Sequence, residues 1–325
     1  MINFKLQLAQ TIMGNPDKFE QYESQDPGLG TSYQKSVKRI LNEDGSYNIK
    51  RIGTIRMLKD FYKYLVDLNA WKFGTFLVGS FLVANLLFAG IYCWIGTEHL
   101  HGINPNQNPF IAAYYFSAQT FTTVGYGAIA PIGNLTSFVA AMEAFVGLIA
   151  FAIATGLIYG RFSRPSTKIA FSHNVIITPH KDKMALMFKI VNQRNSVLLN
   201  TKVHVLLSMI DEDSSSNMIT RKYYNIPLEV DFVRYFPLTW TLVHVINDDS
   251  PLYNINLSEI REKLSELLII IEAFDETYSQ TVIRKHSYAE HQWATGVKFK
   301  KNFSADDNGT IILNINEISD LEVLS

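Results

Sequence analysis

Five consecutive residues near the middle of the chain have the types and the spacing needed to hold a dehydrated cation with backbone oxygens. They are Thr123, Val124, Gly125, Tyr126 and Gly127, within the stretch FTTVGYGAIAP. A hard cation such as potassium crosses a narrow path without a large barrier only if oxygen atoms replace its hydration shell. Successive carbonyl groups can do so if all of them point inward, which requires backbone dihedral angles that glycine adopts most readily. The alternating glycines therefore predict a carbonyl-lined cation site, with the Thr123 hydroxyl as a further ligand and Tyr126 splayed outward.

Two long apolar segments flank this loop and predict a membrane protein. Between residues 73 and 160 the sequence has no Lys or Arg, and its only acidic residues are Glu98 and Glu143. The segments 71–95 and 135–162 each exceed the roughly 20 residues that an α-helix needs to cross the hydrocarbon core. We therefore expect two transmembrane helices.

The basic residues near these segments predict the orientation of the chain. They cluster just before the first segment and just after the second, whereas the connection between the segments has none. The two clusters comprise Lys50, Arg51, Arg56, Lys59, Lys63, Arg161, Arg164 and Lys168. By the positive-inside rule, both termini face the cytoplasm and residues 96–134 face the opposite side. We expect a multi-pass protein of the cell membrane, either a plasma or an inner membrane.

A half-length helix is predicted directly before the loop. Asn108 suits the N-cap and Pro109 the first helical position, and residues 109–122 are too few to span a membrane. We expect a re-entrant pore helix whose carboxyl end, the negative end of its dipole, favours a cation. TVGYG forms the selectivity filter of potassium channels when four chains contribute one loop each, so residues 123–127 predict a potassium filter and three identical partner subunits. The alternative, a chance string in a β-hairpin, does not explain its place between two spans.

The remaining sequence predicts an amphipathic helix and a β domain. Residues 55–70 have one apolar face, which predicts a slide helix along the cytoplasmic membrane surface, with a plain connector helix as the alternative. Beyond residue 165, short β-branched and aromatic runs separated by turn clusters predict an all-β sandwich, with one helical pattern at 258–266. The predicted division is a cytoplasmic segment 1–54, a slide helix 55–70, a transmembrane pore domain 71–165 and a cytoplasmic β-sandwich domain 166–325.

The assembled chain resembles the inward-rectifier potassium channels, most nearly their prokaryotic, KirBac-like branch. Besides the filter, the resemblance is carried by the runs RILNEDGSYNI, GRFSRP, IAFSHNVII, LMFKIVNQRNS, WTLVHVINDDSPLYNI and HQWATGVKF. It implies a homotetramer, a pore formed by the second spans, an immunoglobulin-like cytoplasmic domain that continues the pathway, and gating where the inner helices converge. It also implies that RILNEDGSYNI, residues 39–49, forms an N-terminal cytoplasmic strand.

The resemblance assigns three residues of the second span to the pore. Tyr159 stands at the position of the gate at the bundle crossing, although a tyrosine of the interfacial aromatic belt is the alternative. Two turns earlier, Phe151 stands where strongly rectifying eukaryotic members carry an acid that attracts polyamines, so we expect weak polyamine-dependent rectification. Thr155, between these two, is a candidate polar pore-lining residue.

Four further residues are assigned around the filter and the cytoplasmic pathway. Gln119 stands where many eukaryotic members have a glutamate that braces the filter. Glu143 is a candidate for supplying that carboxylate from behind, with exposure at the outer interface as the alternative. Ala273 and Phe274 lie in EAFDETYSQT, which resembles the loop that narrows the cytoplasmic pore, although Ala273 replaces a usual glycine.

A lipid site is also implied by the resemblance. Lys63, Lys72, Arg161, Arg164 and Lys168 could form a pocket for a phosphoinositide or another anionic lipid headgroup. Ordinary positive-inside charge explains the same residues equally well. The sign of any regulation by lipid stays open.

Other classes of function find little support in the sequence. The formal net charge of −1 argues against a nucleic-acid partner, and the single cysteine excludes an intramolecular disulfide. The chain lacks the arginine-rich span of a voltage-gated channel and the Gly-x-Gly-x-x-Gly turn of a nucleotide-sensing tail. A ligand-binding or enzymatic β domain would need a spacing of catalytic or metal-binding residues that its scattered histidines do not supply. We therefore expect a channel rather than an enzyme, with no cofactor and with K+ at the filter as the only metal.

Overall fold

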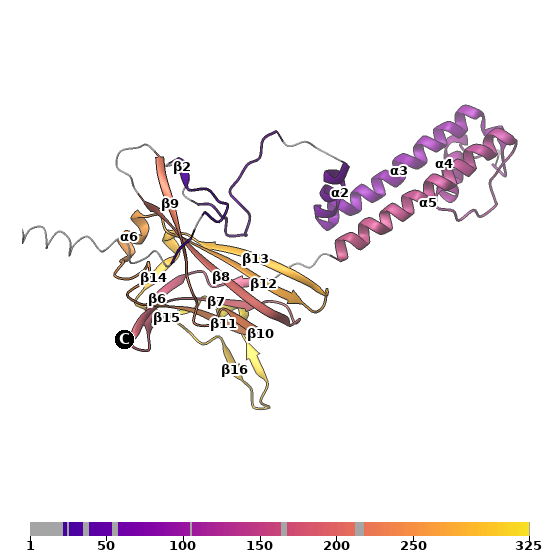
Figure 1. The fold of residues 1–325 in the computed structure, drawn as a ribbon. Helices are drawn as coiled ribbons and strands as arrows, with labels where there is room; N and C mark the ends of the chain where they lie inside the picture. Colours follow the sequence, from indigo (N-terminus) through magenta and orange to yellow (C-terminus); the bar gives the residue numbers. More distant parts are fainter. Residues whose placement is uncertain are drawn as a thin grey trace, which may run out of the picture. The chain divides into compact units, whose positions relative to one another are not determined.

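The computed structural model describes residues 22–24, 26–34, 39–53, 58–104, 106–163, 168–211 and 218–324. Arg164 and the first residues of the predicted slide helix lie outside these ranges. The contacts divide the chain into a helical unit, residues 52–164, and a β unit formed by residues 1–51 with 165–325. Figure 1 shows the helices of the first unit and the strands of the second. Each unit has a hydrophobic core of its own.

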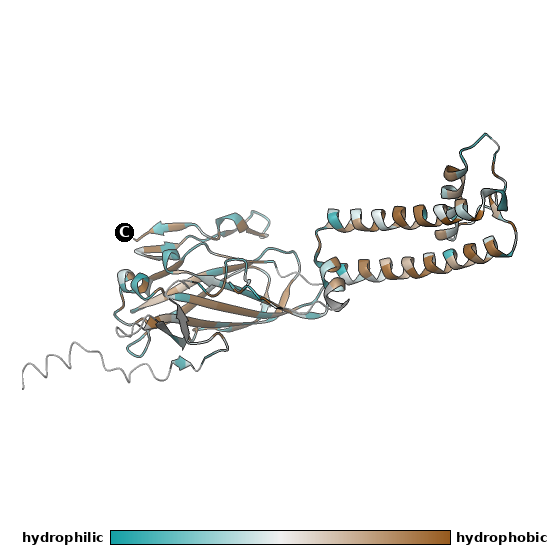
Figure 2. Cartoon of the chain, turned by 90° about the horizontal axis from the view of Figure 1, so that it is seen from above, coloured by the Kyte–Doolittle hydropathy of each residue, from teal (hydrophilic) through white to brown (hydrophobic). Residues whose placement is uncertain are grey.

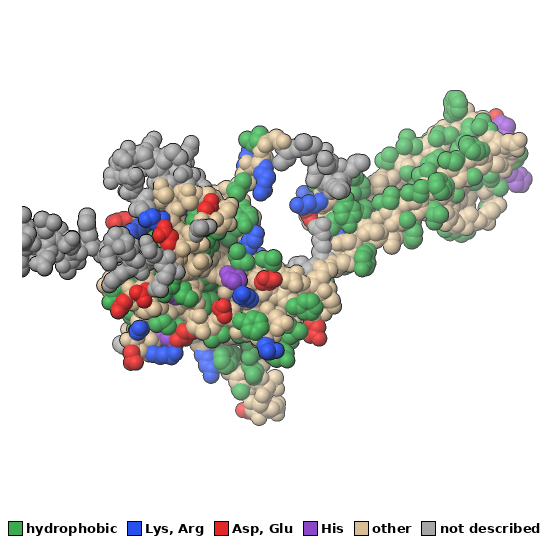
Figure 3. Space-filling model, in the orientation of Figure 1, with side chains coloured by type: hydrophobic (Ala, Val, Ile, Leu, Met, Phe, Trp, Pro, Cys, Tyr) green, Lys and Arg blue, Asp and Glu red, His purple; other side chains and the backbone are tan. Residues whose placement is uncertain are grey.

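The described residues of the helical unit form four α-helices. They are α2 (Leu58–Asp67), α3 (Ala70–Ile95), α4 (Pro109–Phe121) and α5 (Asn134–Phe162). The helices α3 and α5, of 26 and 29 residues, are long and apolar enough to cross a membrane. Figure 2 shows this hydrophobic character along both helices, and Figure 3 shows hydrophobic side chains over their visible surface. Side-chain caps begin two of the helices, because Asn69 accepts a hydrogen bond from the Lys72 N–H and Asn108 accepts one from the Phe110 N–H.

A short β-ladder closes the connection between α3 and α5. After the 3-10 helix η2 (Thr97–His99), strand β3 (Leu100–His101) pairs antiparallel with β4 (Ala130–Pro131). The Ile132 N–H donates to the His99 carbonyl at 2.7 Å. The ladder brings the two ends of the connection together, so α4 and the loop after it are enclosed as one excursion from the long helices.

The β unit is a sandwich of two sheets. The larger sheet has the order β1-β9-β8-β12-β13, with β10 beside β8 and β2 beside β9, and the smaller has the order β11-β7-β6-β14, with β5 beside β7. The strands of the larger sheet are β1 (Glu23–Ser24), β2 (Ser32–Gln34), β8 (Leu198–Asp211), β9 (Met218–Asn225), β10 (Phe232–Phe236), β12 (Glu266–Asp275) and β13 (Gln280–Tyr288). Those of the smaller sheet are β5 (Ile169–Phe171), β6 (Val175–His180), β7 (Lys183–Asn192), β11 (Thr239–Ile246) and β14 (Trp293–Thr295).

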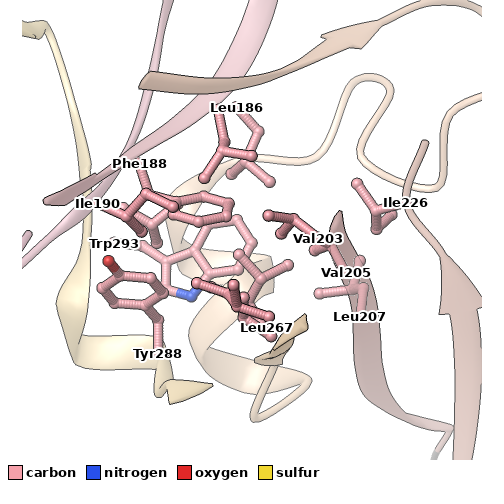
Figure 4. Close-up of a cluster of buried hydrophobic side chains, with 14 of the residues drawn as sticks. Leu186, Phe188, Ile190, Val203, Val205, Leu207, Ile226, Leu267, Tyr288 and Trp293 are labelled. Carbon is pink, nitrogen blue, oxygen red and sulfur yellow. The ribbon is translucent and has the colours of Figure 1, made fainter. Parts of the chain in front are cut away.

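The core of the sandwich follows from strand alternation. In β8, Val203, Val205 and Leu207 are buried and pack with β7 residues of the facing sheet, as Figure 4 shows. The alternation predicts a solvent-facing Ser208, but that residue is fully buried. The reason is a hydrogen bond, because the Arg221 guanidinium donates to the Ser208 hydroxyl at 3.1 Å.

Short elements connect and extend the sheets. They are α6 (Leu257–Glu262), η3 (Glu290–Gln292), β15 (Val297–Phe299), β16 (Phe303–Ala305), β17 (Ile311–Leu313), η4 (Ile315–Glu317) and β18 (Leu321–Val323). The helix predicted at 258–266 ends earlier, at Glu262. Leu264 has a left-handed φ of 40°, which turns the chain out of the helix, and Glu266 opens β12 opposite Ser208.

The N-terminal strand predicted at 39–49 is absent from the described residues of that range. They form a turn at Gly45, with φ 85°, and a single bridge between Leu41 and Tyr47. Side chains of the larger sheet hold this segment, since the Glu266 carboxylate accepts the N–H groups of Ile40 and Leu41 at 2.9 and 3.1 Å. The preceding residues, for which the sequence predicts no structure, supply β1 and β2 at the edge strand β9.

Candidate functional site

The loop after α4 has an alternating backbone. Thr123, Gly125 and Gly127 have positive φ values of 60°, 55° and 79°, whereas Val124 and Tyr126 between them do not. In an ordinary strand, successive residues present their groups to opposite sides. A change in the sign of φ at every residue removes this alternation, so neighbouring carbonyl groups can face the same side. The loop therefore has the backbone that a row of oxygen ligands requires.

Glycine is favoured at these two positions by the backbone conformation, and not because a side chain would clash with its surroundings. A Cβ atom built on Gly125 or Gly127 meets no other atom within 4 Å. Their positive φ is what disfavours other residues. Thr123 adopts the left-handed region without being glycine, at a cost of about 1–3 kcal/mol, and such strain is typical of functional sites. The Val124 and Tyr126 side chains are 54% and 82% exposed, so the loop presents two large apolar surfaces outward.

Gln119 holds the loop at two places. Its backbone carbonyl accepts the Gly125 N–H at 3.1 Å, and its side-chain amide donates to the Ile129 carbonyl at 3.3 Å. The Thr123 N–H also donates to the Thr120 carbonyl at 3.0 Å. The last turn of α4 thus fixes both the start of the loop and its return. This is where the structure places the predicted filter support Gln119.

Glu143 lies in a buried polar network behind the loop. Its side chain is fully buried and accepts hydrogen bonds from the Tyr92 hydroxyl at 2.6 Å and the Ser117 hydroxyl at 2.5 Å. The Ser117 hydroxyl also lies 3.0 Å from Oδ1 of Asn85. The network joins α3, α4 and α5. The alternative that Glu143 is exposed at the membrane interface is therefore wrong for this chain.

Sequence reasoning missed Asn85, Tyr92 and Ser117. One signal was present, because Asn85 is an amide in an otherwise apolar span and a buried polar group needs a partner.

A close contact between backbones sets the depth of α4 against α5. A Cβ on Gly147 would overlap the carbonyl oxygen of Phe121, so the glycine lets α5 approach the residue where α4 ends. These contacts place the loop at a fixed position relative to both long helices.

The chemistry of this site favours a cation held by backbone oxygens. The carboxyl end of α4 carries the negative end of the helix dipole, and no Lys or Arg occurs between residues 73 and 160. Among the described residues, no group of three His, Cys, Asp or Glu side chains could hold a metal ion. The loop carbonyls and the Thr123 hydroxyl are thus the ligands that the site offers to a hard monovalent cation.

Comparison with known proteins decides the class of the chain. Residues 80–164 match the "Ion channel" family model, and residues 169–323 match "Inward rectifier potassium channel C-terminal domain". The chain is 32% identical over 285 residues to "Inward rectifier potassium channel Kirbac3.1" of Paramagnetospirillum magnetotacticum, covering 87% of this chain and 95% of that protein. The chain belongs to the inward rectifier potassium channel family.

More distant relatives of the channel come from animals. It is 26% identical over 291 residues to "ATP-sensitive inward rectifier potassium channel 12" of Gallus gallus, covering 82% of this chain and 68% of that protein. Among solved structures, the sporulation control protein Spo0M of Bacillus subtilis shares 7% identity at a TM-score of 0.23, over 39% of this chain and 49% of that one. A TM-score this low does not indicate a shared fold.

The sequence matches confirm the predicted KirBac-like resemblance and the two-span pore with a β-rich domain.

The pore residues predicted on the second span share one face of α5. Phe151, Thr155 and Tyr159 follow one another at intervals of four, which places them one above another on a helix. Phe151 and Tyr159 are 72% and 73% exposed, and the Thr155 hydroxyl donates to the Phe151 carbonyl at 2.9 Å. Within the single chain, the other described parts of the helical unit therefore leave this face of α5 uncovered.

Arg161, two residues after Tyr159, caps the carboxyl end of α2. Its Nη1 donates to the carbonyl oxygens of Leu68, Val66 and Leu65 at 2.5, 2.9 and 3.4 Å. Its guanidinium also lies over the Phe73 ring, 4.6 Å from the centroid. A cation at this position compensates the negative end of the α2 dipole. The arginine thus connects α2 to the last turn of α5.

The other predicted lipid ligands are differently placed. Lys63 of α2 and Lys72 of α3 are exposed in the helical unit, and Lys168 is exposed in the β unit. Next to Arg161, the backbone of α5 also packs closely against α2, since a Cβ atom built on Gly160 would stand only 2.5 Å from the Tyr62 hydroxyl. The charge of Arg161 is therefore already engaged by protein groups, whereas the charges of Lys63 and Lys72 face outward.

The two residues predicted in the loop of the β domain point to opposite sides. Ala273 is 1% exposed and belongs to the sandwich core, whereas Phe274 is 36% exposed. The pairing of β12 with β8 shifts register between Glu272 and Phe274. Only Phe274 of this pair is available to line a pathway. The turn itself is tightened by Asp275, whose side chain accepts the Thr277 N–H at 3.0 Å.

Proposed function

We propose that this chain forms a homotetrameric channel that conducts K+ passively through a filter made of residues 123–127. The observation that carries the proposal is the alternating sign of φ at Thr123, Gly125 and Gly127, directly after a capped half-helix. Four such loops around one axis would surround a dehydrated ion with carbonyl oxygens. The channel needs no cofactor in this scheme, because the permeant ion is its only ligand at the filter.

Glu143 and Gln119 act as supports of this filter. The Glu143 network ties the pore helix α4 to both spans, and Gln119 ties the loop to the last turn of α4. Neither side chain needs to contact the ion. They position the loop, so their loss should change selectivity or stability before it changes the number of ligands.

Gating takes place at Tyr159, where the inner helices of four subunits converge. Its exposed ring on the same face as Phe151 and Thr155 supports this assignment. The β domain would continue the pathway, with the half-exposed Phe274 near the end of strand β12 at its narrow part. Phe151 gives the cavity no fixed negative charge, so polyamines gain little from entering it and rectification is weak.

Both termini are cytoplasmic, and the channel lies in a plasma or inner membrane. The distribution of Lys and Arg around the two spans supports this orientation. Anionic lipid, a phosphoinositide or another headgroup, would modulate the channel through the exposed Lys63, Lys72 and Lys168. Arg161 would join a headgroup only by leaving the carbonyl groups of α2.

A matched pair of glycine variants tests the filter assignment. Gly125→Ala places a Cβ at a positive φ and should abolish K+ uptake into proteoliposomes without dispersing the tetramer. Gly79→Ala, in α3, also adds a Cβ that meets no atom within 4 Å but has an ordinary helical backbone, so it should conduct normally. Undiminished uptake by the Gly125→Ala channel would remove residues 123–127 from the ion pathway.

A further inference from the structure

The β domain has a cavity whose lining carries several lysines and no acid among the described residues. It lies on the outer face of the smaller sheet and has a volume of about 420 Å³. On that sheet the core-facing side chains include Ile177, Phe188 and Leu242, so the alternate residues point away from the sandwich. The chain segment around β15 and β16 lies beside these alternate residues and forms the other wall of the cavity, which is open to solvent.

Lys189 lies at the base of this cavity and is an unusual residue for a sheet surface. Its side chain is only 6% exposed, and Thr241 lies directly opposite it in β11. Its ammonium group donates to the Lys300 carbonyl at 2.5 Å and to the Asn302 side chain at 3.3 Å, and it lies 5.4 Å from the Phe299 ring. All three partners are neutral. A buried cation without a bonded carboxylate is costly unless an anion accompanies it.

The charges around Lys189 do not cancel. Among the described residues that line the cavity there are four lysines, at 189, 298, 300 and 301, and no acid. Lys298 is paired with Glu322 at 3.1 Å, and Asp320 acts on Lys189 only at a distance, while burial lowers the pKa of Lys189. Lys300 and Lys301 are exposed at the cavity, and no carboxylate of the described residues lies within ion-pair distance of either ammonium group. The cavity therefore has a net positive charge.

Thr178 adds an independent sign of a missing ligand. It belongs to the lining, is 3% exposed, and its hydroxyl has no hydrogen-bond partner in the described part of the chain. A buried hydroxyl is normally paired, and an unpaired one costs about 1–3 kcal/mol. If the Thr178 side chain turns toward the cavity, an oxygen atom of an anion bound against Lys189 would supply the acceptor that its hydroxyl lacks.

We propose that this cavity binds a small, multiply charged phosphate anion. Several ammonium groups around hydroxyl donors suit the oxygens of a phosphate group, for which lysine is a common binder, better than the single charge of a carboxylate. The anion could be free in solution or part of a lipid headgroup. Bound there, it would strengthen the attachment of the C-terminal segment to the sheet at Lys189, whose ammonium group already donates to the Lys300 carbonyl and the Asn302 side chain.

Calorimetric titration of the full-length channel in detergent with sodium triphosphate tests this site. Saturable binding is expected, weakened at least tenfold by the combined Lys300→Ala and Lys301→Ala substitutions. Lys181→Ala should bind normally, because that exposed lysine pairs with Glu229 and lies outside the cavity. The absence of saturable binding, or equal binding by the double variant, would overturn the proposal.

Thr178→Val separates a ligand-binding role from a structural one. Because the hydroxyl has no hydrogen-bond partner among the described residues, its removal should leave the melting temperature unchanged or raise it, yet weaken triphosphate binding several-fold. Unchanged binding would exclude Thr178 from the site and contradict the geometry proposed.

Vesicles with phosphatidylinositol phosphate, compared with plain phosphatidylcholine vesicles, identify the source of the anion. Displacement of triphosphate by the first alone indicates a headgroup, and no displacement indicates a free phosphate.

Discussion

The Ser117 hydroxyl of the pore helix lies 2.5 Å from the Glu143 carboxylate of the second span. The same carboxylate accepts the Tyr92 hydroxyl of the first span at 2.6 Å. One acid thus connects α3, α4 and α5 behind the loop at residues 123–127. Because all three side chains are fully buried, none can replace a lost partner with bulk water.

We predict that Glu143→Ala destabilises the channel. The change leaves the buried Tyr92 hydroxyl without an acceptor, at a cost of about 1–3 kcal/mol, whereas the Ser117 hydroxyl can still donate to Oδ1 of Asn85 at 3.0 Å. Glu143→Gln should cost less, because the amide can accept from Tyr92 and donate to Ser117. The measurement is the thermal dissociation of the tetramer in detergent. Glu98→Ala is the control, as Glu98 is exposed and is the only other acid between residues 73 and 160; equal losses in both alanine variants would contradict the account.

A second prediction concerns the connection between α2 and α5. Arg161→Gln removes the cation that caps α2, at a cost of about 1–2 kcal/mol. Amide hydrogen exchange in residues 58–67 should then become roughly tenfold faster. Lys63→Gln, on the exposed side of α2, should leave exchange unchanged. If Arg161→Gln exchanges like the parent channel, the three hydrogen bonds to α2 do not stabilise that helix.

Rectification provides a third prediction. Outward current through the parent channel should fall only slightly with spermine on the cytoplasmic side, because Phe151 offers no charge to the cavity. Phe151→Asp places four carboxylates around the axis and should produce steep, voltage-dependent block. Thr155→Ser, one turn along the same face, is a control that adds no charge. Steep block of the parent channel would show that another acid acts in the pathway.

The helical unit was largely predictable because its signals are local. The Asn108 cap, the apolar periods and the spacing of Gly125 and Gly127 each occupy a few neighbouring residues, and the structure has a helix and an alternating backbone at those places. The supports of the loop are not local. Glu143 is 51 residues away from Tyr92 and 26 residues away from Ser117 in the sequence, and hydrophobic periodicity does not indicate which distant residues pair.

The β unit shows the same limit for the N-terminal segment. The family resemblance implies a strand at residues 39–49, but the Glu266 carboxylate accepts the N–H groups of Ile40 and Leu41 that a strand would donate to a neighbour. These partners are 226 and 225 residues apart. The role of Arg161 was likewise not predictable from the sequence. A basic residue at this end of a span fits both the positive-inside rule and the capping of a neighbouring helix.

The N-terminal segment also gives a pH prediction through His286. Burial lowers the pKa of His286 most, the nearby Arg39 and Arg284 also lower it, and hydrogen bonding to the Glu43 carbonyl raises it, so that the pKa is about 4. The ring stacks on Phe171 at 4.2 Å. Between pH 4 and the ordinary value near 6.5, the unfolded chain binds more protons than the folded one. Stability should therefore fall as the pH drops from about 6.5 to about 4, by roughly 3 kcal/mol at most.

Melting temperatures of the full-length channel across this pH range provide the measurement. His286→Gln should flatten the acid side of the profile, because it removes the titrating ring. His204→Gln should leave the profile unchanged, since His204 is exposed on β8. Identical profiles for the parent channel and His286→Gln would assign the acid sensitivity to other groups.

The central claim is that carbonyl oxygens of residues 123–127 select K+, and paired flux measurements in liposomes test it most directly. Vesicles that contain the purified channel should take up K+ and Rb+, should exclude Na+, and should stop conducting when Ba2+ is added. Equal uptake of Na+ and K+ would contradict the claim.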